Sequence, residues 1–366
     1  MKKFGSLFVL FAILVPSFVQ AKVRTVSNYI PNSAQYDNVQ AAINASNLGD
    51  TVYIHGSPIN YGNFTIDRRL CLIGAGYNLA NNRYNYNTEI GTITFDSLKV
   101  LPALPKHIKG SLLVGLRFGS VNVGSYNFIR DLIIDRCHGG VTMAGSNWIV
   151  KNSWISLNVS PQVSMFANGS VYRLSRNVAI NNCFVTGLNN GGSTTGAFGF
   201  SPGMVVNHCI FPNGVPYTTG AVFNNNIFLG SVYLTTSSTS YAGNVYNNNM
   251  TYQANTTLAL LPGIYNTGAN NKNNAFPAFT SVTTYSLGSP SIAFNDFDFT
   301  LDPSSQGYNS GTNGTSLGIT GGAYPMNGSD LEGRPRLPLV TELSIFNPVI
   351  NQGQPLNVRI KAKKVK

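Results

Sequence analysis

The side chains of this sequence with the greatest capacity for chemistry are charged groups gathered between residues 117 and 151. They combine two carboxylates with guanidinium, imidazole and ammonium groups, which transfer protons or pair with anions. Together they could hold an anionic sugar, with an arginine or the lysine acting as a base. The alternative is a set of solvated surface charges with one aspartate at a turn. The candidates are Arg117, Arg130, Asp131, Asp135, Arg136, His138 and Lys151.

Carboxylates are otherwise scarce in the centre of the chain, where residues 97 to 295 contain only Asp131 and Asp135. Glycoside hydrolysis requires an acid and a base or nucleophile at a fixed separation, and a calcium site requires several oxygen ligands. No nucleophile–base arrangement, phosphate-binding glycine loop or metal-ligand spacing is present in the sequence. We therefore expect neither a metal nor a cofactor. We also expect Asp296, Asp298 and Asp302 to decorate a turn rather than bind calcium.

The first 21 residues have the three-part layout of a secretory signal peptide. Lys2 and Lys3 precede an apolar run from Leu7 to Val15, and Val19-Gln20-Ala21 fits a cleavage site. The run is shorter than the ~20 residues that span a bilayer, and no second stretch of this kind follows. The sequence therefore predicts a secreted or cell-surface protein whose mature chain has no transmembrane segment.

The composition is poor in charge and rich in small polar residues. Charged residues make up 10% of the chain, whereas ~25% is typical of soluble proteins. Asparagine (45 residues) and glycine (37 residues) are abundant instead, and the net charge is +11. A nucleic-acid surface requires basic residues clustered on one folded face, which this sequence does not show. We expect no nucleic-acid partner, and an affinity for anionic surfaces or glycans.

One short pattern recurs along the middle of the chain, with successive copies starting 16 to 30 residues apart. Each copy has two or three apolar residues, a polar residue, a residue that tolerates a left-handed backbone, a small or polar residue, and two further apolar positions. Such a unit predicts two short strands that meet at a corner and must stack on neighbouring units. The copies start at Leu112, Phe128, Ile149, Ala179, Val205, Val222 and Val245. The expected corners are Gly115, Asp131, Asn152, Asn182, His208, Asn225 and Asn248.

Stacking of these units has three consequences. The corner asparagine side chains should bond to one another up and down the stack. Cys183 and Cys209 should lie at the same place in neighbouring coils, where a disulfide and a column of free thiols are both open.

Two apolar columns follow the corner, and because alternate strand residues face opposite ways, one column must face outward. We expect loops or the tail to cover that column, the alternative being a binding surface. The columns are Ile133, Trp154, Phe184, Ile210, Ile227, Met250 and Ile134, Ile155, Val185, Phe211, Phe228, Thr251.

The repeat resembles the right-handed parallel β-helix of the pectate lyase-like superfamily. A predicted helix at 36–46, followed by Gly49-Asp50 and a strand, resembles the capped N-terminal end of that superfamily, and Leu301 to Tyr324 resembles its last coils. The resemblance implies an all-β fold, a right-handed single-stranded parallel β-helix with an N-terminal capping helix. Related pectin hydrolases use several aspartates on one face, and related lyases use a calcium-binding carboxylate cluster with a basic residue. The Asn-Thr-Asp, Asp-Asp, His-Gly and Arg-Ile-Lys motifs of the hydrolases are absent here.

The expected organisation is a signal peptide at 1–21, a β-helix domain at 22–330, and a short two-strand β tail at 331–366 that projects or docks rather than adding a coil. The expected function is binding or scaffolding on extracellular carbohydrate at the cell surface. One alternative is a divergent polysaccharide lyase or glycoside hydrolase acting on an acidic polysaccharide. Another is a structural surface or filament component.

Overall fold

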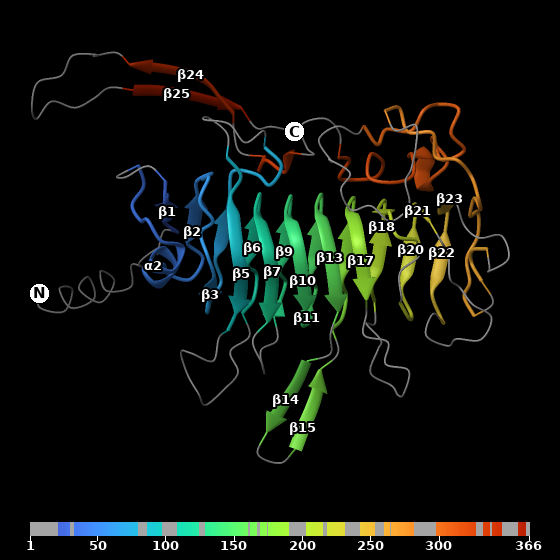
Figure 1. Cartoon of the computed structure of the whole chain (residues 1–366), viewed down its shortest axis with the longest axis horizontal. Coiled ribbons are helices and arrows are strands. Elements are labelled where there is room, and N and C mark those ends of the chain that lie inside the picture. Colours follow the sequence, from blue (N-terminus) through green and yellow to red (C-terminus); the bar gives the residue numbers. More distant parts are fainter. Residues whose placement is uncertain are drawn as a thin grey trace, which may run out of the picture.

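The computed structural model describes residues 21–29, 33–79, 86–96, 108–123, 129–159, 162–166, 169–173, 175–189, 203–214, 218–230, 242–252, 260–263, 265–281, 298–326, 332–336, 339–345 and 358–363. These residues form a parallel β-helix in which two long parallel sheets run side by side along the molecule (Figure 1). The predicted all-β fold class is therefore confirmed. The predicted signal peptide lies outside the described residues, apart from Ala21.

Each coil contributes one strand to sheet A, turns a tight corner, and contributes the next strand to sheet B. In spatial order, sheet A contains β1 (Val23–Val26), β2 (Thr51–Ile54), β4 (Cys71–Ile73), β6 (Leu112–Val114), β9 (Ile133–Asp135), β12 (Ile149–Lys151), β16 (Ala179–Asn181), β18 (Val205–Asn207), β20 (Val222–Asn224) and β22 (Val245–Asn247). Sheet B contains β3 (Phe64–Ile66), β5 (Glu89–Phe95), β7 (Arg117–Val123), β10 (His138–Met143), β13 (Trp154–Val159), β17 (Phe184–Asn189), β19 (Ile210–Phe211), β21 (Ile227–Leu229) and β23 (Met250–Tyr252).

The corner between the sheets is set by a residue in the left-handed region of the backbone. An L residue pays a steric penalty there unless it is glycine or a short polar residue such as asparagine. The predicted corners at Asn152, Asn182, His208, Asn225 and Asn248 all have φ between 49° and 60°. Gly115 has φ 66°. The sequence pattern thus located the turns correctly in six of the seven copies.

The copy that starts at Phe128 was aligned incorrectly. Ile133 of β9 pairs with Ile149 of β12, so the corner of this coil is Arg136, with φ 51°. Asp131 also has a positive φ, of 54°, but it lies at the corner before the sheet A strand. Asn147, with φ 59°, is the equivalent residue of the next coil. Both corners of this coil tolerate a left-handed residue, and local sequence does not distinguish them. In the outward column His138 therefore takes the place assigned to Ile133.

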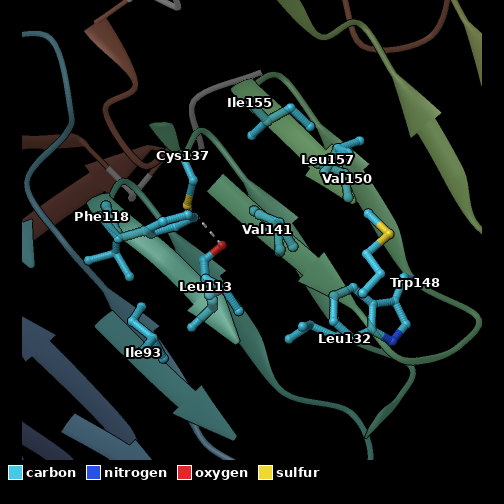
Figure 2. Packing of buried hydrophobic residues seen from close by; sticks show 14 of the residues in the cluster. Ile93, Leu113, Phe118, Leu132, Cys137, Val141, Trp148, Val150, Ile155 and Leu157 are labelled. Atoms are coloured by element: carbon cyan, nitrogen blue, oxygen red, sulfur yellow. Dashed lines mark hydrogen bonds between the residues drawn. The ribbon is translucent and has the colours of Figure 1, made fainter. Parts of the chain in front are cut away.

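The core is a continuous cluster of apolar side chains enclosed by the coils, to which both sheets contribute. The middle residue of nearly every sheet A strand points inward, and Leu113, Ile134 and Val150 are fully buried. Figure 2 shows Leu113 and Val150 in the same cluster as inward residues of sheet B such as Val141 and Ile155. Burial of a side chain of this size contributes about 1.5–3 kcal/mol, and the same position repeats in every coil.

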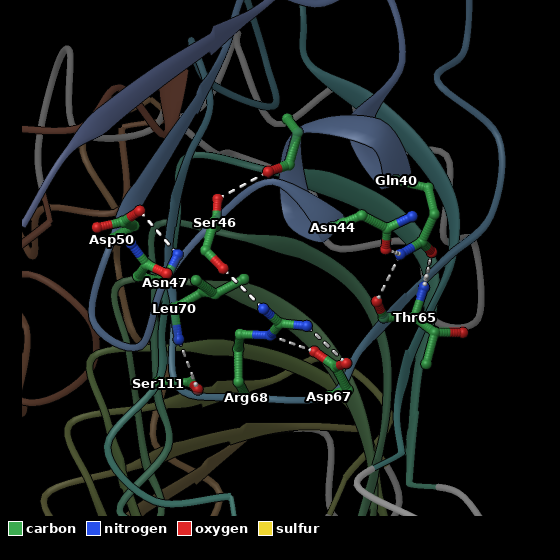
Figure 3. Close-up of polar contacts among 11 residues, drawn as sticks. Gln40, Asn44, Ser46, Asn47, Asp50, Thr65, Asp67, Arg68, Leu70 and Ser111 are labelled. Carbon is green, nitrogen blue, oxygen red and sulfur yellow. Dashed lines mark hydrogen bonds and ion pairs between the residues drawn. The ribbon is translucent and has the colours of Figure 1, made fainter. Parts of the chain in front are cut away.

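A short helix and a polar network close the N-terminal end. Helix α2 (Val39–Asn44) begins at Asn38, whose side chain accepts a hydrogen bond from the backbone of Ala41 at 3.1 Å, and its buried face covers the first coils. The predicted capping helix is therefore confirmed. Below it, Arg68 binds Asp67 and the carbonyl of Ser46 (Figure 3). In the described part of the chain no helix is long and apolar enough to cross a membrane, since α2 has six residues.

Cys183 and Cys209 occupy equivalent positions in neighbouring coils, and both are buried free thiols. Each sulfur donates to the carbonyl two residues earlier, at 3.2 Å for Asn181 and 3.3 Å for Asn207. Burial is the largest of the effects that raise the pKa of Cys183 well above its ordinary value. Of the two arrangements that the sequence left open, the structure has the column of thiols.

Residues 298–326 are called the strap from here on. The resemblance of Leu301 to Tyr324 predicts that they form the last coils, and this prediction is wrong. They contribute no strand to either sheet and instead run back along the corners, covering the C-terminal half of the molecule (orange in Figure 1). The strap contains one 3-10 turn, η3 (Thr312–Gly314). A later segment, 332–336, reaches the coil of Tyr77, whose backbone donates to the carbonyl of Glu332 at 3.1 Å.

The corner asparagines bind the strap rather than one another, which corrects the ladder predicted at this position. The side-chain amide of Asn182 donates to the carbonyls of Ile319 (2.9 Å) and Gly321 (2.6 Å). That of Asn152 donates to the carbonyl of Tyr324 at 2.7 Å. The side-chain oxygen of Asn225 accepts from the backbone of Thr312 at 2.9 Å. Amide ladders that follow the stack occur instead on either side of the corner, as in Asn181–Asn207.

The strap also covers the outward apolar column of sheet B, as expected. Ile210, Ile227 and Met250 are fully buried, although they point away from the core inside the coils. They pack in a second cluster with Leu317 and Ile319 of the strap. The cover stops near Phe184, and Trp154 on the next strand is only partly buried.

Two hairpins and one short pair of strands complete the structure. Strands β14 (Gln162–Phe166) and β15 (Gly169–Arg173) form an antiparallel hairpin that projects from the coils, and β8 (Ile129–Arg130) pairs with β11 (Gly145–Ser146). Strands β24 (Leu339–Ile345) and β25 (Val358–Lys363) pair antiparallel as a separate sheet (Figure 1). The predicted two-strand C-terminal tail is thus present.

Removal of a strap-binding amide should destabilise the protein. In Asn182→Gly the backbone keeps its positive φ, but the carbonyls of Ile319 and Gly321 lose their donor, so we expect a loss of about 2 kcal/mol in the free energy of unfolding. Asn270→Gly is the matched control, because Asn270 also has a positive φ (59°), is exposed and makes no hydrogen bond to the strap. Denaturant titration of both variants tests this, and equal losses would show that the strap bonds contribute nothing.

Candidate functional site

The outer face of sheet B is open where the strap ends. A groove of about 510 Å³ lies there, across β5, β7, β10 and β13. Its volume is within the range of small-molecule sites, roughly 300–1,000 Å³. The groove contains two of the candidates from the sequence, Arg117 and His138.

A row of unlike side chains crosses these strands at one register position. Glu89 of β5 lies opposite Arg117 of β7, which lies opposite His138 of β10. His138 lies opposite Trp154 of β13, and Trp154 lies opposite Phe184 of β17. Neighbouring strands are ~4.8 Å apart, so each of these residues lies beside the next. We call this set the groove row.

The aromatic members of the groove row are in contact with one another. The imidazole of His138 and the indole of Trp154 have centroids 4.7 Å apart at 35°. On its other side His138 meets the ring of Tyr77 at 5.8 Å. Trp154 meets Phe184 edge-on at 5.6 Å, and Phe184 meets Phe299 of the strap at the same distance. The groove thus ends in an aromatic wall anchored in the covered apolar cluster.

Glycines line the floor beside the row on three adjacent strands, two of them open to the groove and the first covered by the side chain of Asn63. These are Gly91, Gly119 and Gly140. A Cβ on Gly119 would lie 3.1 Å from the carbonyl oxygen of Gly91, tighter than nearly all real contacts. The register also shifts between β7 and β10 at this point, and such bulges redirect side chains next to binding sites. A ligand can therefore approach the backbone of the sheet directly.

His138 is neutral at ordinary pH. Burial lowers its pKa, and the positive charge of Arg117 lowers it further, to about 4. The imidazole therefore presents a neutral ring, able both to donate and to accept a hydrogen bond.

Arg117 and Glu89 form an ion pair at the outer end of the row. Nη1 of Arg117 lies 3.1 Å from Oε1 of Glu89, and the two side chains are 46% and 37% exposed. A pair this exposed contributes little to stability, ~0–1 kcal/mol. Most of the guanidinium N–H groups remain open to the groove, since the contact with Glu89 uses one nitrogen.

The remaining candidates lie elsewhere, so the structure divides the predicted cluster. Asp135, Arg136 and Lys151 meet at the corner below the groove, where Oδ1 of Asp135 binds Arg136 at 3.0 Å and Oδ2 lies 3.5 Å from Lys151. Lys151 also lies over the ring of Tyr324, 4.6 Å from its centroid. Asp135 and Arg136 are nearly buried. This group holds the corner against the strap and has no free carboxylate.

Arg130 and Asp131 lie at the other corner of the coil. Oδ2 of Asp131 is 3.7 Å from Lys109, and Oδ1 accepts from the side chain of Asn147 at 2.9 Å. Arg130 is exposed. Neither lines the groove, so they match the prediction of solvated coil charges.

Metal ligands are not assembled in the described residues, where no group of three or more histidine, cysteine or acidic side chains is close enough to hold an ion. Asp298 and Asp302 each accept a hydrogen bond from the backbone two residues later, at 2.9 Å and 2.8 Å. They decorate turns, as expected. Asp296 lies outside the described residues.

Sequence reasoning missed Glu89, Tyr77 and the glycines of the floor. Glu89 and Tyr77 belong to the coil of β4 and β5, which lacks the corner repeat, so nothing in their local sequence placed Glu89 beside Arg117 or Tyr77 beside His138. The sequence pattern places Trp154 in an apolar column and does not indicate a binding site there. The glycine pairs in Phe118-Gly119 and Gly139-Gly140 were the available signal, because glycine inside a strand marks a bulge or a close approach.

Comparison with protein-family models and with curated proteins found no match. The likeness to other proteins therefore rests on the parallel β-helix itself, a fold that serves many functions.

The stability of the protein should depend on pH through His138. The folded-state pKa of about 4 is below the ordinary 6.5, so between these values the unfolded chain takes up a proton that the folded protein does not. The free energy of unfolding should fall as pH falls from 6.5 towards 4, by at most about 1.4 kcal/mol per pH unit. In His138→Phe, which keeps an aromatic ring, this part of the decrease should disappear.

Urea titrations of both proteins across this range provide the measurement. His55 and His208 also have lowered pKa values because of burial, but they are present in both proteins and cancel. Parallel stability curves for the two proteins would contradict the assignment to His138.

Proposed function

We propose that this protein is a secreted β-helix protein of the pectate lyase-like superfamily that binds an acidic polysaccharide at or outside the cell surface. The observation that carries the proposal is the groove row, in which one arginine and a histidine–tryptophan pair in ring contact border a floor of glycine backbone. The chain would be exported by the signal peptide expected at residues 1–21.

The parts of the row suit the parts of a uronic acid. A sugar ring has an apolar face, which packs on aromatic side chains such as Trp154. Its carboxylate matches the planar fork of a guanidinium, which Arg117 supplies. The neutral His138 can donate to or accept from a hydroxyl, and Glu89 can accept from one. The glycine floor leaves room for the ring over β7 and β10.

The net charge of +11 supports an anionic ligand. A positive potential raises the local concentration of polyanions and accelerates their association, and salt weakens both effects. Arg117 is the one cation among the residues that line the groove.

A polysaccharide lyase is the second candidate, favoured by a neutral imidazole on the strand next to a guanidinium. In that reaction Arg117 would neutralise the uronate carboxylate, and His138 would take the proton from the adjacent carbon. The glycosidic C–O bond would break as the carbon–carbon double bond forms, and the departing oxygen would take a proton from solvent. The corner group of Asp135, Arg136 and Lys151 would take no part, because its charges are engaged with one another.

Binding should depend on Arg117 specifically. Polygalacturonate titrated into the protein should bind about tenfold more weakly to Arg117→Gln, because one charged hydrogen bond is lost. Arg130→Gln removes the same charge outside the groove and should change affinity little. Glu89→Gln should tighten binding, because it removes the carboxylate that competes for Arg117. Calorimetry provides the affinities, and equal small losses in both arginine variants would reduce the effect to net charge.

Catalysis is tested separately by incubating the protein with polygalacturonate or alginate, with and without calcium, and measuring unsaturated chain ends. For a binding protein we expect none. Turnover that persists in Arg130→Gln and disappears in Arg117→Gln and His138→Phe would instead establish the lyase. Such turnover should not require calcium, since the groove offers one carboxylate, that of Glu89.

A further inference from the structure

A second groove, of about 530 Å³, lies between the outer edge of sheet A and the strap. It shares no lining residue with the first groove. Its walls are amides and hydroxyls, and no residue that lines it carries a charged side chain. Its lining includes Asn181, Asn207 and Asn224 from the coils and Thr312 and Tyr324 from the strap.

One wall is a ladder of asparagine side chains that follows the stack. The side-chain nitrogen of Asn207 donates to the oxygen of Asn181 at 3.1 Å, and that of Asn224 donates to Asn207 at 3.0 Å. Asn247 continues the ladder, donating to Asn224 at 3.2 Å, but it does not line the groove.

The ladder leaves hydrogen-bonding capacity open in every coil. A carboxamide has two N–H donors and an oxygen that accepts two hydrogen bonds. Within the ladder, Asn207 and Asn224 each donate one hydrogen bond and accept one. Both side chains are half-buried. One donor and one acceptor per coil therefore face the groove, repeated at the strand spacing of ~4.8 Å.

The strap forms the opposite wall. It presents the ring of Tyr324, which is 43% exposed, and Thr312, whose hydroxyl donates to Asn225 at 3.2 Å and accepts from Asn248 at 3.3 Å. Lys151 lies over this ring, 4.6 Å from its centroid. The tyrosine offers a flat apolar surface beside a row of paired donors and acceptors.

This wall chemistry selects among ligand classes. An anionic ligand would lose hydration without gaining an ion pair, and burial lowers the pKa of His208, the one titratable side chain between the asparagines. An extended peptide presents its groups on one side every ~6.6–6.8 Å, two residues apart, which does not match the ladder. A chain of sugar rings does match, because every ring carries hydroxyls that donate and accept on both of its edges. Consecutive rings can therefore meet consecutive coils even when alternate rings are turned over.

We propose that this groove is a second binding site, for a neutral polysaccharide lying along the axis of the coils. Hydroxyls of successive sugars would bind Asn207 and Asn224, and one ring would pack on Tyr324. The proposal does not depend on what the first groove binds.

The experiment uses the mature chain and three uncharged β-1,4-linked probes, cellohexaose, xylohexaose and chitohexaose, with calorimetry as the measurement. At least one probe should bind, with equal affinity at low and high salt. Asn207→Ala should weaken that binding about tenfold. Asn247→Ala is the matched control, since it removes the same group from the same ladder one coil beyond the groove, and it should leave binding unchanged.

Two further variants separate the remaining outcomes. Tyr324→Ala should also weaken binding about tenfold without altering the ladder, and it serves as the test if Asn207→Ala does not fold. Arg117→Gln should bind the neutral probe normally, whatever it does to polygalacturonate. The proposal is overturned if none of the three probes binds, if Asn207→Ala and Asn247→Ala behave alike, or if Arg117→Gln abolishes binding of the neutral probe.

Discussion

The parallel stacking of coils is the constraint on which the rest of this structure depends. Each residue has the equivalent residue of the next coil ~4.8 Å above or below it. A residue type that repeats at one position of the coil therefore forms a continuous column along the molecule. A repeated apolar residue gives the fully buried file of Leu113, Ile134 and Val150. A repeated asparagine gives a continuous amide ladder. The left-handed corner residues maintain this register, because each turns the chain at the same place.

The same stacking creates a difficulty that the strap resolves. When two consecutive columns after the corner are apolar, one of them must face outward, and over several coils that exposes a long hydrophobic row. The strap buries Ile210, Ile227 and Met250 from outside. It is held by side chains of corner asparagines, so the residues that turn each coil also attach the cover. The candidate binding groove lies on the part of sheet B that the strap does not cover.

Charge is used sparingly, and almost every charge in the central coils has a local partner. Asp135 is engaged by Arg136 and Lys151, and Asp131 by Lys109. Arg117 pairs with Glu89 through one nitrogen, in an exposed pair. Recognition in the proposed function therefore depends on one guanidinium and the aromatic rings beside it. The amides line the separate groove beside the strap.

The sequence by itself determined the coil and most of its corners, because both depend on local patterns. Asn152, Asn182 and Asn225 could be recognised since few residues tolerate a left-handed backbone, and the helix at Val39–Asn44 could be recognised from its apolar spacing. The register of Ile133 to Asp135 could not, because Asp131 and Arg136 both occupy left-handed corners and only pairing with Ile149 distinguishes them. The strap and both grooves were also decided by the tertiary structure. Their residues come from coils far apart in sequence, and which column is covered depends on a segment more than fifty residues downstream, whose contacts no local pattern encodes.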